Sequence, residues 1–288
     1  MSEQALLKVR DLTVTYRLGT AFGASRKRVL EAVKKVSFDI HAGQGFALVG
    51  ESGSGKTTIS RAILGLVPTS GGSIEFDGRD VTRHNKASLA SFRRDVQVVF
   101  QDPRSSLNPR RTIRDAIGSV LRRHHALTRL QTDTRVAELL DNVGLPSYHM
   151  QRFPGELSGG QRQRVAIAKA LATKPRLLVC DEPVSALDVS TQSQILNLLS
   201  DLRRQFGLAY LFISHDLAVV RQIAEIVAVL HRGAIVEMGP TEQIYREPTQ
   251  PYTRVLLSSV LNHDPRGRDE RRAARASLRA ASAVNANI

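Results

Sequence analysis

The stretch that decides the fold is Gly50-Glu51-Ser52-Gly53-Ser54-Gly55-Lys56-Thr57, with Thr58 after it. It matches the G-x-x-x-x-G-K-[ST] phosphate loop, and it lies between a short apolar strand pattern, Phe46–Val49, and a helical pattern over Lys56–Leu66. Glycines let successive N–H groups turn toward phosphate oxygens, and the following helix adds its positive N-terminal end. We therefore expect Lys56 to reach the β- and γ-phosphates of a nucleotide and Thr57 to offer its hydroxyl to Mg²⁺.

Strand and helix patterns alternate after this loop. Leu177–Cys180 predicts a strand, Thr191–Phe206 a helix and Tyr210–Ile213 another strand, which together imply a largely parallel α/β core. Upstream, Lys8–Tyr16 and Val33–Ile40 alternate polar and apolar residues. These two segments predict strands of an antiparallel β subdomain, joined by a loop over residues 19–28.

The middle of the chain changes to helical spacing. From Pro103 to Pro154 the clearest apolar stripe comprises Val136, Leu139, Leu140 and Val143. We expect an α-helical subdomain inserted at about residues 103–155.

Two adjacent carboxylates, Asp181 and Glu182, follow the apolar strand pattern Leu177–Cys180. Alone, this pattern is typical of a strand that enters a solvated turn. Next to a phosphate loop it predicts that Asp181 holds Mg²⁺ and that Glu182 polarises the attacking water.

A third motif, Leu157-Ser158-Gly159-Gly160-Gln161, precedes a helical pattern and then the Asp181-Glu182 pair. It matches the ABC signature sequence, and the chain resembles the ATP-binding subunits of ABC transporters. Further residues occur in the family's order and spacing: Gln101 of the Q-loop, Ser185-Ala186-Leu187-Asp188 of the D-loop, His215 as switch histidine, and Tyr16 as the adenine-stacking aromatic.

The resemblance implies a P-loop ATPase domain over residues 1–245, in which two copies meet head to tail with ATP between them. Ser158, Gly159, Gly160 and Gln161 would face the γ-phosphate held by the other subunit, because the start of a helix binds anions. ATP contacts are also implied for Tyr16, Asp188 and the phosphate loop through Thr58. The resemblance also implies that Thr57, Gln101 and Asp181 bind Mg²⁺, and that Glu182, His215 and Gln101 are the catalytic residues.

Several stretches resemble the ATPases of dipeptide and oligopeptide importers in particular. They are Gln101-Asp102-Pro103, Ser106-Leu107-Asn108-Pro109-Arg110, Arg152-Phe153-Pro154-Gly155-Glu156, the segment from Cys180 to Ser190, and Ile244-Tyr245-Arg246-Glu247-Pro248 with Pro251-Tyr252-Thr253. We therefore expect a C-terminal extension of this type over residues 246–265 and a basic, flexible tail over 266–288. Gln250 stands where the family often has histidine, and the extension has no cysteine to ligate an iron–sulfur cluster.

The same resemblance implies the partners: a second, non-identical ABC ATPase, two membrane permeases and, indirectly, a solute-binding protein. The chain would then act as a peripheral subunit on the cytoplasmic face of the inner membrane. Peptides are the expected cargo, and nickel, glutathione or sugars stay open, because relatives with these motifs serve all of them.

Bulk properties limit the alternatives. The net charge of +14 suits a soluble ABC ATPase that acts on nucleic acid or ribosomes, but one phosphate loop and no sustained heptads argue against that class. A regulatory cassette without hydrolysis is disfavoured because Glu182 and His215 are both present. We expect no signal peptide, no membrane span and, with Cys180 as the single cysteine, no internal disulfide.

Overall fold

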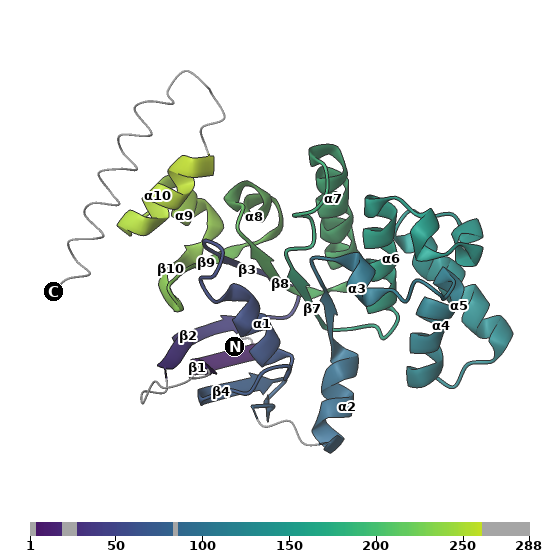
Figure 1. The fold of residues 1–288 in the computed structure, drawn as a ribbon, viewed down its shortest axis with the longest axis horizontal. Helices are drawn as coiled ribbons and strands as arrows, with labels where there is room; N and C mark the ends of the chain where they lie inside the picture. Colours follow the sequence, from purple (N-terminus) through teal and green to yellow (C-terminus); the bar gives the residue numbers. More distant parts are fainter. Residues whose placement is uncertain (1–3, 19–27, 83–85, 261–288) are drawn as a thin grey trace, which may run out of the picture.

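The computed structural model describes residues 4–18, 28–82 and 86–260 (Figure 1). Most of the loop predicted over residues 19–28, and the whole tail predicted over 266–288, lie outside the described residues.

A large, mostly parallel sheet forms the centre of the molecule. Within the described ranges its strand order is β10-β9-β3-β8-β7-β6, and β10 alone runs antiparallel to its neighbour. The strands are β3 (Gly45–Val49), β6 (Val96–Val99), β7 (Leu177–Asp181), β8 (Ala209–Ser214), β9 (Ile226–His231) and β10 (Ala234–Pro240). Every residue of β3, β7 and β8 is buried, as expected for strands with helices on both faces.

A smaller antiparallel sheet has the order β2-β1-β4-β5 among the described residues. Its strands are β1 (Leu7–Leu18), β2 (Arg28–Ile40), β4 (Gly71–Phe76) and β5 (Arg79–Asp80). Apolar side chains of this sheet, such as Leu12 and Ile40, share one buried cluster with Ile59 and Ile63 of helix α1 (Lys56–Ile63). The small sheet thus covers the helix that follows the phosphate loop.

The remaining helices flank the large sheet and extend to both ends of the molecule. Figure 1 shows α4, α5 and α6 at the opposite end from α9 and α10. The helices are α2 (Lys86–Asp95), α3 (Pro103–Ser106), α4 (Ile113–His124), α5 (Arg129–Asn142), α6 (Gly159–Leu171), α7 (Val189–Phe206), α8 (Leu217–Ile223), α9 (Thr241–Arg246) and α10 (Pro251–Val260), with 3-10 turns at Ser147–Gln151 and Pro154–Glu156. No helix of the described ranges is long and apolar enough to cross a membrane.

The predicted fold class is confirmed: an α/β core with an antiparallel β subdomain, an inserted helical subdomain and C-terminal helices. The stripe Val136, Leu139, Leu140 and Val143 is buried in one cluster with Val165 of α6, so the insertion shares its core with the rest. Several bounds differ from expectation. Helix α7 begins at Val189 instead of Thr191, because Asp188 caps it, and α1 ends at Ile63 instead of Leu66.

Candidate functional site

Several of the predicted site residues gather at one edge of the large sheet, where its parallel strands end. The phosphate loop follows β3, His215 follows β8, Asp181 ends β7, and Gln101 comes shortly after β6. Because β3, β8, β7 and β6 are neighbours in that order, four segments far apart in sequence meet along a single edge. Ligands of open α/β sheets bind at this carboxyl edge.

Two glycines of the phosphate loop pass so close to other backbone that no side chain fits. A Cβ on Gly50 would lie 2.2 Å from the carbonyl oxygen of Leu230, and one on Gly55 would lie 2.5 Å from that of Ala32. Both also have positive φ angles, +153° and +107°, which glycine tolerates best. The loop is therefore held between β9 and β2, and its conformation is set by backbone packing.

Lys56 lies 4% exposed beneath this loop, and its Nζ donates to the carbonyl oxygens of Gly50 and Glu51, each at 2.8 Å. Burial lowers the pKa of Lys56, although the nearby carboxylates of Glu182 and Asp181 act in the opposite direction. The ammonium is thus folded back on its own loop, close to where an anion would sit.

Ser54 adds a second polar group to this cradle. Its Oγ is buried and has no hydrogen-bond partner among the described residues. A buried hydroxyl without a partner is costly, and a phosphate oxygen in the loop would satisfy it. The loop therefore fits a phosphate-bearing ligand.

Asp181 accepts hydrogen bonds from two hydroxyl groups of α1. Thr57 Oγ1 donates to its Oδ1 at 3.1 Å, and Ser60 Oγ donates to its Oδ2 at 3.3 Å. Burial raises the pKa of Asp181; these two hydrogen bonds oppose the shift, and the neighbouring Glu182 adds to it. The sequence motif pointed to Thr57, whereas Ser60 was missed because it lies one helical turn beyond the motif.

A bound Mg²⁺ would find oxygen donors here. No group of three or more His, Cys, Asp or Glu side chains that could hold a metal occurs within the described ranges. Thr57 and Asp181 instead offer one hydroxyl and one carboxylate, a donor set that suits Mg²⁺ when phosphate and water fill the other positions. The residues present fit the ion.

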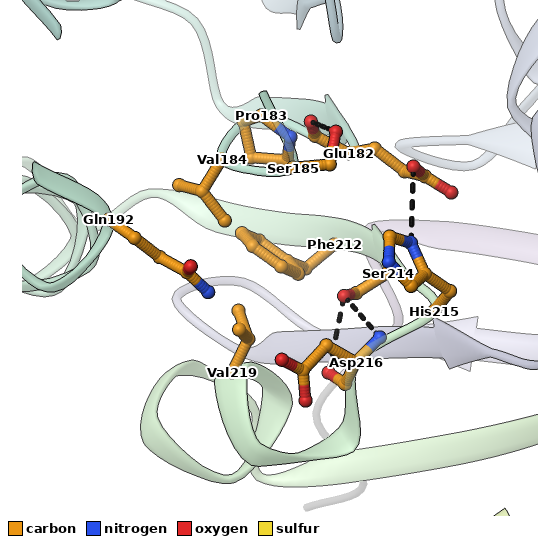
Figure 2. Close-up of a pocket in the computed structure, with 10 residues that line it drawn as sticks. All are labelled: Glu182, Pro183, Val184, Ser185, Gln192, Phe212, Ser214, His215, Asp216 and Val219. Atoms are coloured by element: carbon orange, nitrogen blue, oxygen red, sulfur yellow. Dashed lines mark hydrogen bonds and ion pairs between the residues drawn. The ribbon is translucent and has the colours of Figure 1, made fainter. Parts of the chain in front are cut away.

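Glu182 and His215 face each other across the ends of β7 and β8 (Figure 2). His215 Nδ1 lies 3.3 Å from Glu182 Oε2, and the two side chains are 55% and 17% exposed. Glu182 has a φ of +50°, an uncommon conformation for a residue with a side chain, of the kind that concentrates at functional sites. The turn that presents His215 is fixed by Ser214, whose Oγ accepts from the backbone N–H of Asp216 at 2.9 Å.

Gln101 and Tyr16 differ in their position relative to this edge. Gln101 is exposed directly beyond β6, whose Val99 pairs with Cys180, the residue before Asp181. Tyr16 lies in β1, opposite Leu30 of β2, and is partly buried against the apolar cluster of the small sheet. Topology therefore brings Gln101 beside the carboxylates and leaves Tyr16 in the antiparallel layer.

The signature motif forms the start of α6. Ser158 Oγ accepts from the backbone N–H of Gln161 at 3.2 Å, and Gln161 Oε1 accepts from that of Ser158 at 2.9 Å. A Cβ on Gly160 would lie 2.5 Å from Cγ2 of Thr191 in α7. The contacts of this motif described here are with its own helix and with α7.

Asp188 forms the N-terminal cap of α7. It accepts from the Ser190 hydroxyl at 2.7 Å, and from the backbone N–H and hydroxyl of Thr191 at 2.9 and 2.8 Å. These bonds, that from Ser190 first, lower the pKa of Asp188 to about 2. The next residue, Val189, is 80% exposed, so the D-loop lies at the surface.

The fold and this edge define a phosphate-loop nucleotide site on a parallel α/β sheet. The chain belongs to the ABC transporter family, whose model matches residues 33–185. A second model, described as the oligopeptide/dipeptide transporter C-terminal region, matches residues 236–285.

Curated relatives and solved structures agree with this assignment. The chain is 49% identical over 262 residues to the glutathione import ATP-binding protein GsiA of Escherichia coli K12, and 47% identical to that of Pectobacterium atrosepticum. These alignments cover 91% of the chain and 42% of each relative, so the chain spans under half their length.

Among solved structures, the chain is similar to the ATP-binding cassette MJ0796, a dimer in a post-hydrolysis state bound to ADP and Pi, with TM-score 0.72 and 30% identity over 82% of this chain and 98% of that one. It is also similar to cbiO1 of Clostridium perfringens, with TM-score 0.73 and 26% identity over 85% of this chain and 92% of that one.

Proposed function

We propose that this chain binds and hydrolyses MgATP to power an ABC importer of the oligopeptide/dipeptide type. One observation carries the proposal: the phosphate loop, the Asp181–Thr57 pair and the Glu182–His215 pair lie along one edge of the sheet. Phosphoryl transfer needs these parts together, because catalysis rests on positioning and on electrostatic stabilisation.

Each group of the edge has a distinct role in this proposal. Lys56 exchanges its carbonyl partners for the β- and γ-phosphates, and Thr57 and Asp181 hold Mg²⁺. When bound, the ion neutralises charge on the phosphates. Glu182 accepts a proton from the attacking water as it approaches the γ-phosphorus, and His215, 3.3 Å from that carboxylate, orients it. Gln101, just after the end of β6, contacts Mg²⁺ and the γ-phosphate in this proposal.

A nucleotide titration tests the first step. Lys56→Ala removes the buried ammonium, and we expect MgATP binding to weaken by at least about tenfold, since charge-assisted hydrogen bonds contribute about 1.5–3 kcal/mol each. Lys8→Ala is the matched control, because Lys8 forms a half-exposed ion pair with Glu75 in the small sheet. Equal affinity of wild type and Lys56→Ala would contradict the phosphate-loop assignment.

We further propose that the working unit contains two ATPases with composite sites. The signature at the start of α6 packs on α7 of its own chain and remains free to meet the nucleotide of a second subunit. The dimeric state of the MJ0796 cassette supports this arrangement. The second subunit is proposed to be a non-identical ATPase.

Paired lesions test the composite site. Ser158→Arg puts a bulky side chain where the partner's γ-phosphate would dock and leaves this chain's own phosphate loop intact. Combined with a partner that lacks its phosphate-loop lysine, both lesions fall in one site and the other site stays whole. Ser158→Arg and Lys56→Ala in one chain damage both sites. We expect more ATPase activity from the split arrangement, and equal activity in both would refute composite sites.

The two permeases would dock on the helical subdomain, on the cytoplasmic face of the membrane. Residues 108–111 lie exposed between α3 and α4, a short distance along the chain from Gln101. Cysteines placed at these positions should crosslink to cytoplasmic permease loops in a nucleotide-dependent way. Crosslinks from the C-terminal helices alone would contradict this docking mode.

Short peptides are the proposed cargo, supported by the match of residues 236–285 to the oligopeptide/dipeptide C-terminal region. Glutathione is a second candidate, because the curated relatives at 47–49% identity are glutathione import proteins, and glutathione is itself a small peptide. Uptake of labelled dipeptide and labelled glutathione, measured in host cells with and without Glu182→Gln in this chain, separates the two. The cargo whose uptake stops is the one that this ATPase serves.

A further inference from the structure

One peptide unit of the phosphate loop, between Gly50 and Glu51, is held on both sides. Its carbonyl oxygen accepts from Lys56 Nζ at 2.8 Å, and its N–H, that of Glu51, donates to the Tyr252 hydroxyl at 3.3 Å. A cation at the carbonyl polarises the amide and strengthens its N–H as a donor. The lysine of the phosphate loop and a tyrosine 201 residues from Glu51 in sequence therefore fix the same peptide plane.

Tyr252 reaches the loop from α10, and the residues just before this helix are hydrogen-bonded to β10. The Glu237 carboxylate accepts from the backbone N–H of Thr249 at 2.7 Å and from that of Gln250 at 3.2 Å. Burial opposes ionisation of Glu237, yet the hydrogen bonds from Thr249 and Gln250 help to hold its pKa below the ordinary value. The carboxylate thus stays ionised at neutral pH and fixes the residues that precede α10.

The Tyr252 ring is held as well. It packs on His231 at the end of β9, with ring centroids 4.0 Å apart and planes inclined by 43°. Five residues further along α10, Leu257 is buried in the main apolar cluster. The backbone of α10 and the ring of Tyr252 are therefore both fixed, and the hydroxyl lies at a set position beside the loop.

We propose that Tyr252 is a positioning residue that orders the phosphate loop for ATP, so that the C-terminal helices contribute to nucleotide affinity. This inference rests on the ATP binding proposed above and assigns part of it to residues outside the phosphate loop and the sheet edge. Without the hydroxyl, the Glu51 N–H loses its fixed acceptor, so the Gly50–Glu51 peptide fluctuates more before ATP binds, even though the close glycine contacts still hold the rest of the loop between β9 and β2. ATP binding must then order the loop, which weakens affinity without touching the hydrolytic groups.

The test compares two single-hydroxyl deletions in the C-terminal helices. Tyr252→Phe keeps the ring on His231 and removes the bond to Glu51. Tyr245→Phe is the matched control, because the Tyr245 hydroxyl donates to the carbonyl of Leu217 in α8 and not to the phosphate loop. The measurements are Kd for MgATP and nucleotide-free hydrogen exchange at the Glu51 amide on the full chain, and KM and kcat on the complex purified through a tag on this chain.

We expect Tyr252→Phe to raise Kd and KM by about two- to tenfold, the range of one hydrogen bond, with kcat unchanged and faster exchange at Glu51. Tyr245→Phe should leave affinity and the Glu51 amide as in wild type. Equal shifts in both variants, or none in Tyr252→Phe, would overturn the positioning role. Failure of the wild type itself to bind MgATP would instead refute the proposed function, so the two failures are distinct.

Discussion

Asp181→Asn is expected to stabilise the nucleotide-free protein while it abolishes magnesium-dependent hydrolysis. The Asp181 residue is 6% exposed, and burial and the adjacent Glu182 raise the pKa of its carboxyl group above the ordinary 3.8. Its two hydroxyl donors, Thr57 and Ser60, offset this penalty in part. Asparagine has the same shape, can still bond to both hydroxyls, and removes the buried charge.

The expected gain is about 1 kcal/mol, typical of relieving one unfavourable feature at a functional site. For a chain of this size, that gain raises Tm by about 3 °C. The effect depends on pH, because the folded state holds the Asp181 proton more tightly than the unfolded state. The free energy of unfolding of the wild type therefore falls as the pH rises from about 3.8 through the raised pKa, and the variant lacks this loss.

Thermal unfolding without nucleotide or Mg²⁺, from acidic to neutral pH, measures this difference directly. Asp201→Asn is the control, since Asp201 forms an exposed ion pair with Arg204 and its loss should leave Tm almost unchanged. A Tm for Asp181→Asn at or below that of wild type at neutral pH would refute the reasoning. Retention of magnesium-dependent ATPase activity would refute the assigned role of the carboxylate.

Two further substitutions test the loop and the core. Gly50→Ala places a Cβ 2.2 Å from the Leu230 carbonyl oxygen, so we expect Tm to fall by about 3–9 °C and MgATP affinity to drop. Gly155→Ala, with no atom within 4 Å of its Cβ, should change neither. Tyr210→Phe removes a buried hydroxyl that donates to the Leu199 carbonyl at 2.7 Å, and denaturant unfolding should show a loss of about 1 kcal/mol with the ATPase rate retained.

The carboxyl edge of the large sheet, where the proposed site lies, was the more predictable part of the molecule. Lys56, Asp181 and His215 belong to short motifs with fixed chemistry, and parallel strands carry such motifs to the same edge of a sheet whatever the loops between them. Their local contacts were less accessible. Ser60 donates to Asp181 from one turn inside α1, a geometry that follows from the helix and not from any motif.

The last two strands of the chain, β9 and β10 at one side of the large sheet, were harder to predict. The sequence analysis did not predict Ile226–His231 or Ala234–Pro240. The first is a nearly continuous apolar run, which alone does not distinguish a strand from a buried helix, and the second alternates too weakly to indicate an edge strand. The contact of Tyr252 with Glu51 also spans most of the chain. The sequence motif Pro251-Tyr252-Thr253 indicated the importer type, but only tertiary packing shows that its tyrosine reaches the phosphate loop.

ATP turnover by Glu182→Gln tests the central claim most directly. The measurement is phosphate release from MgATP by the complex purified through a tag on this chain, with Glu242→Gln as control, because Glu242 forms an exposed ion pair with Arg221. We predict that Glu182→Gln retains bound MgATP and hydrolyses it at least about a hundredfold more slowly, since the general base is lost while the phosphate and metal contacts remain. Hydrolysis at the wild-type rate would contradict the account.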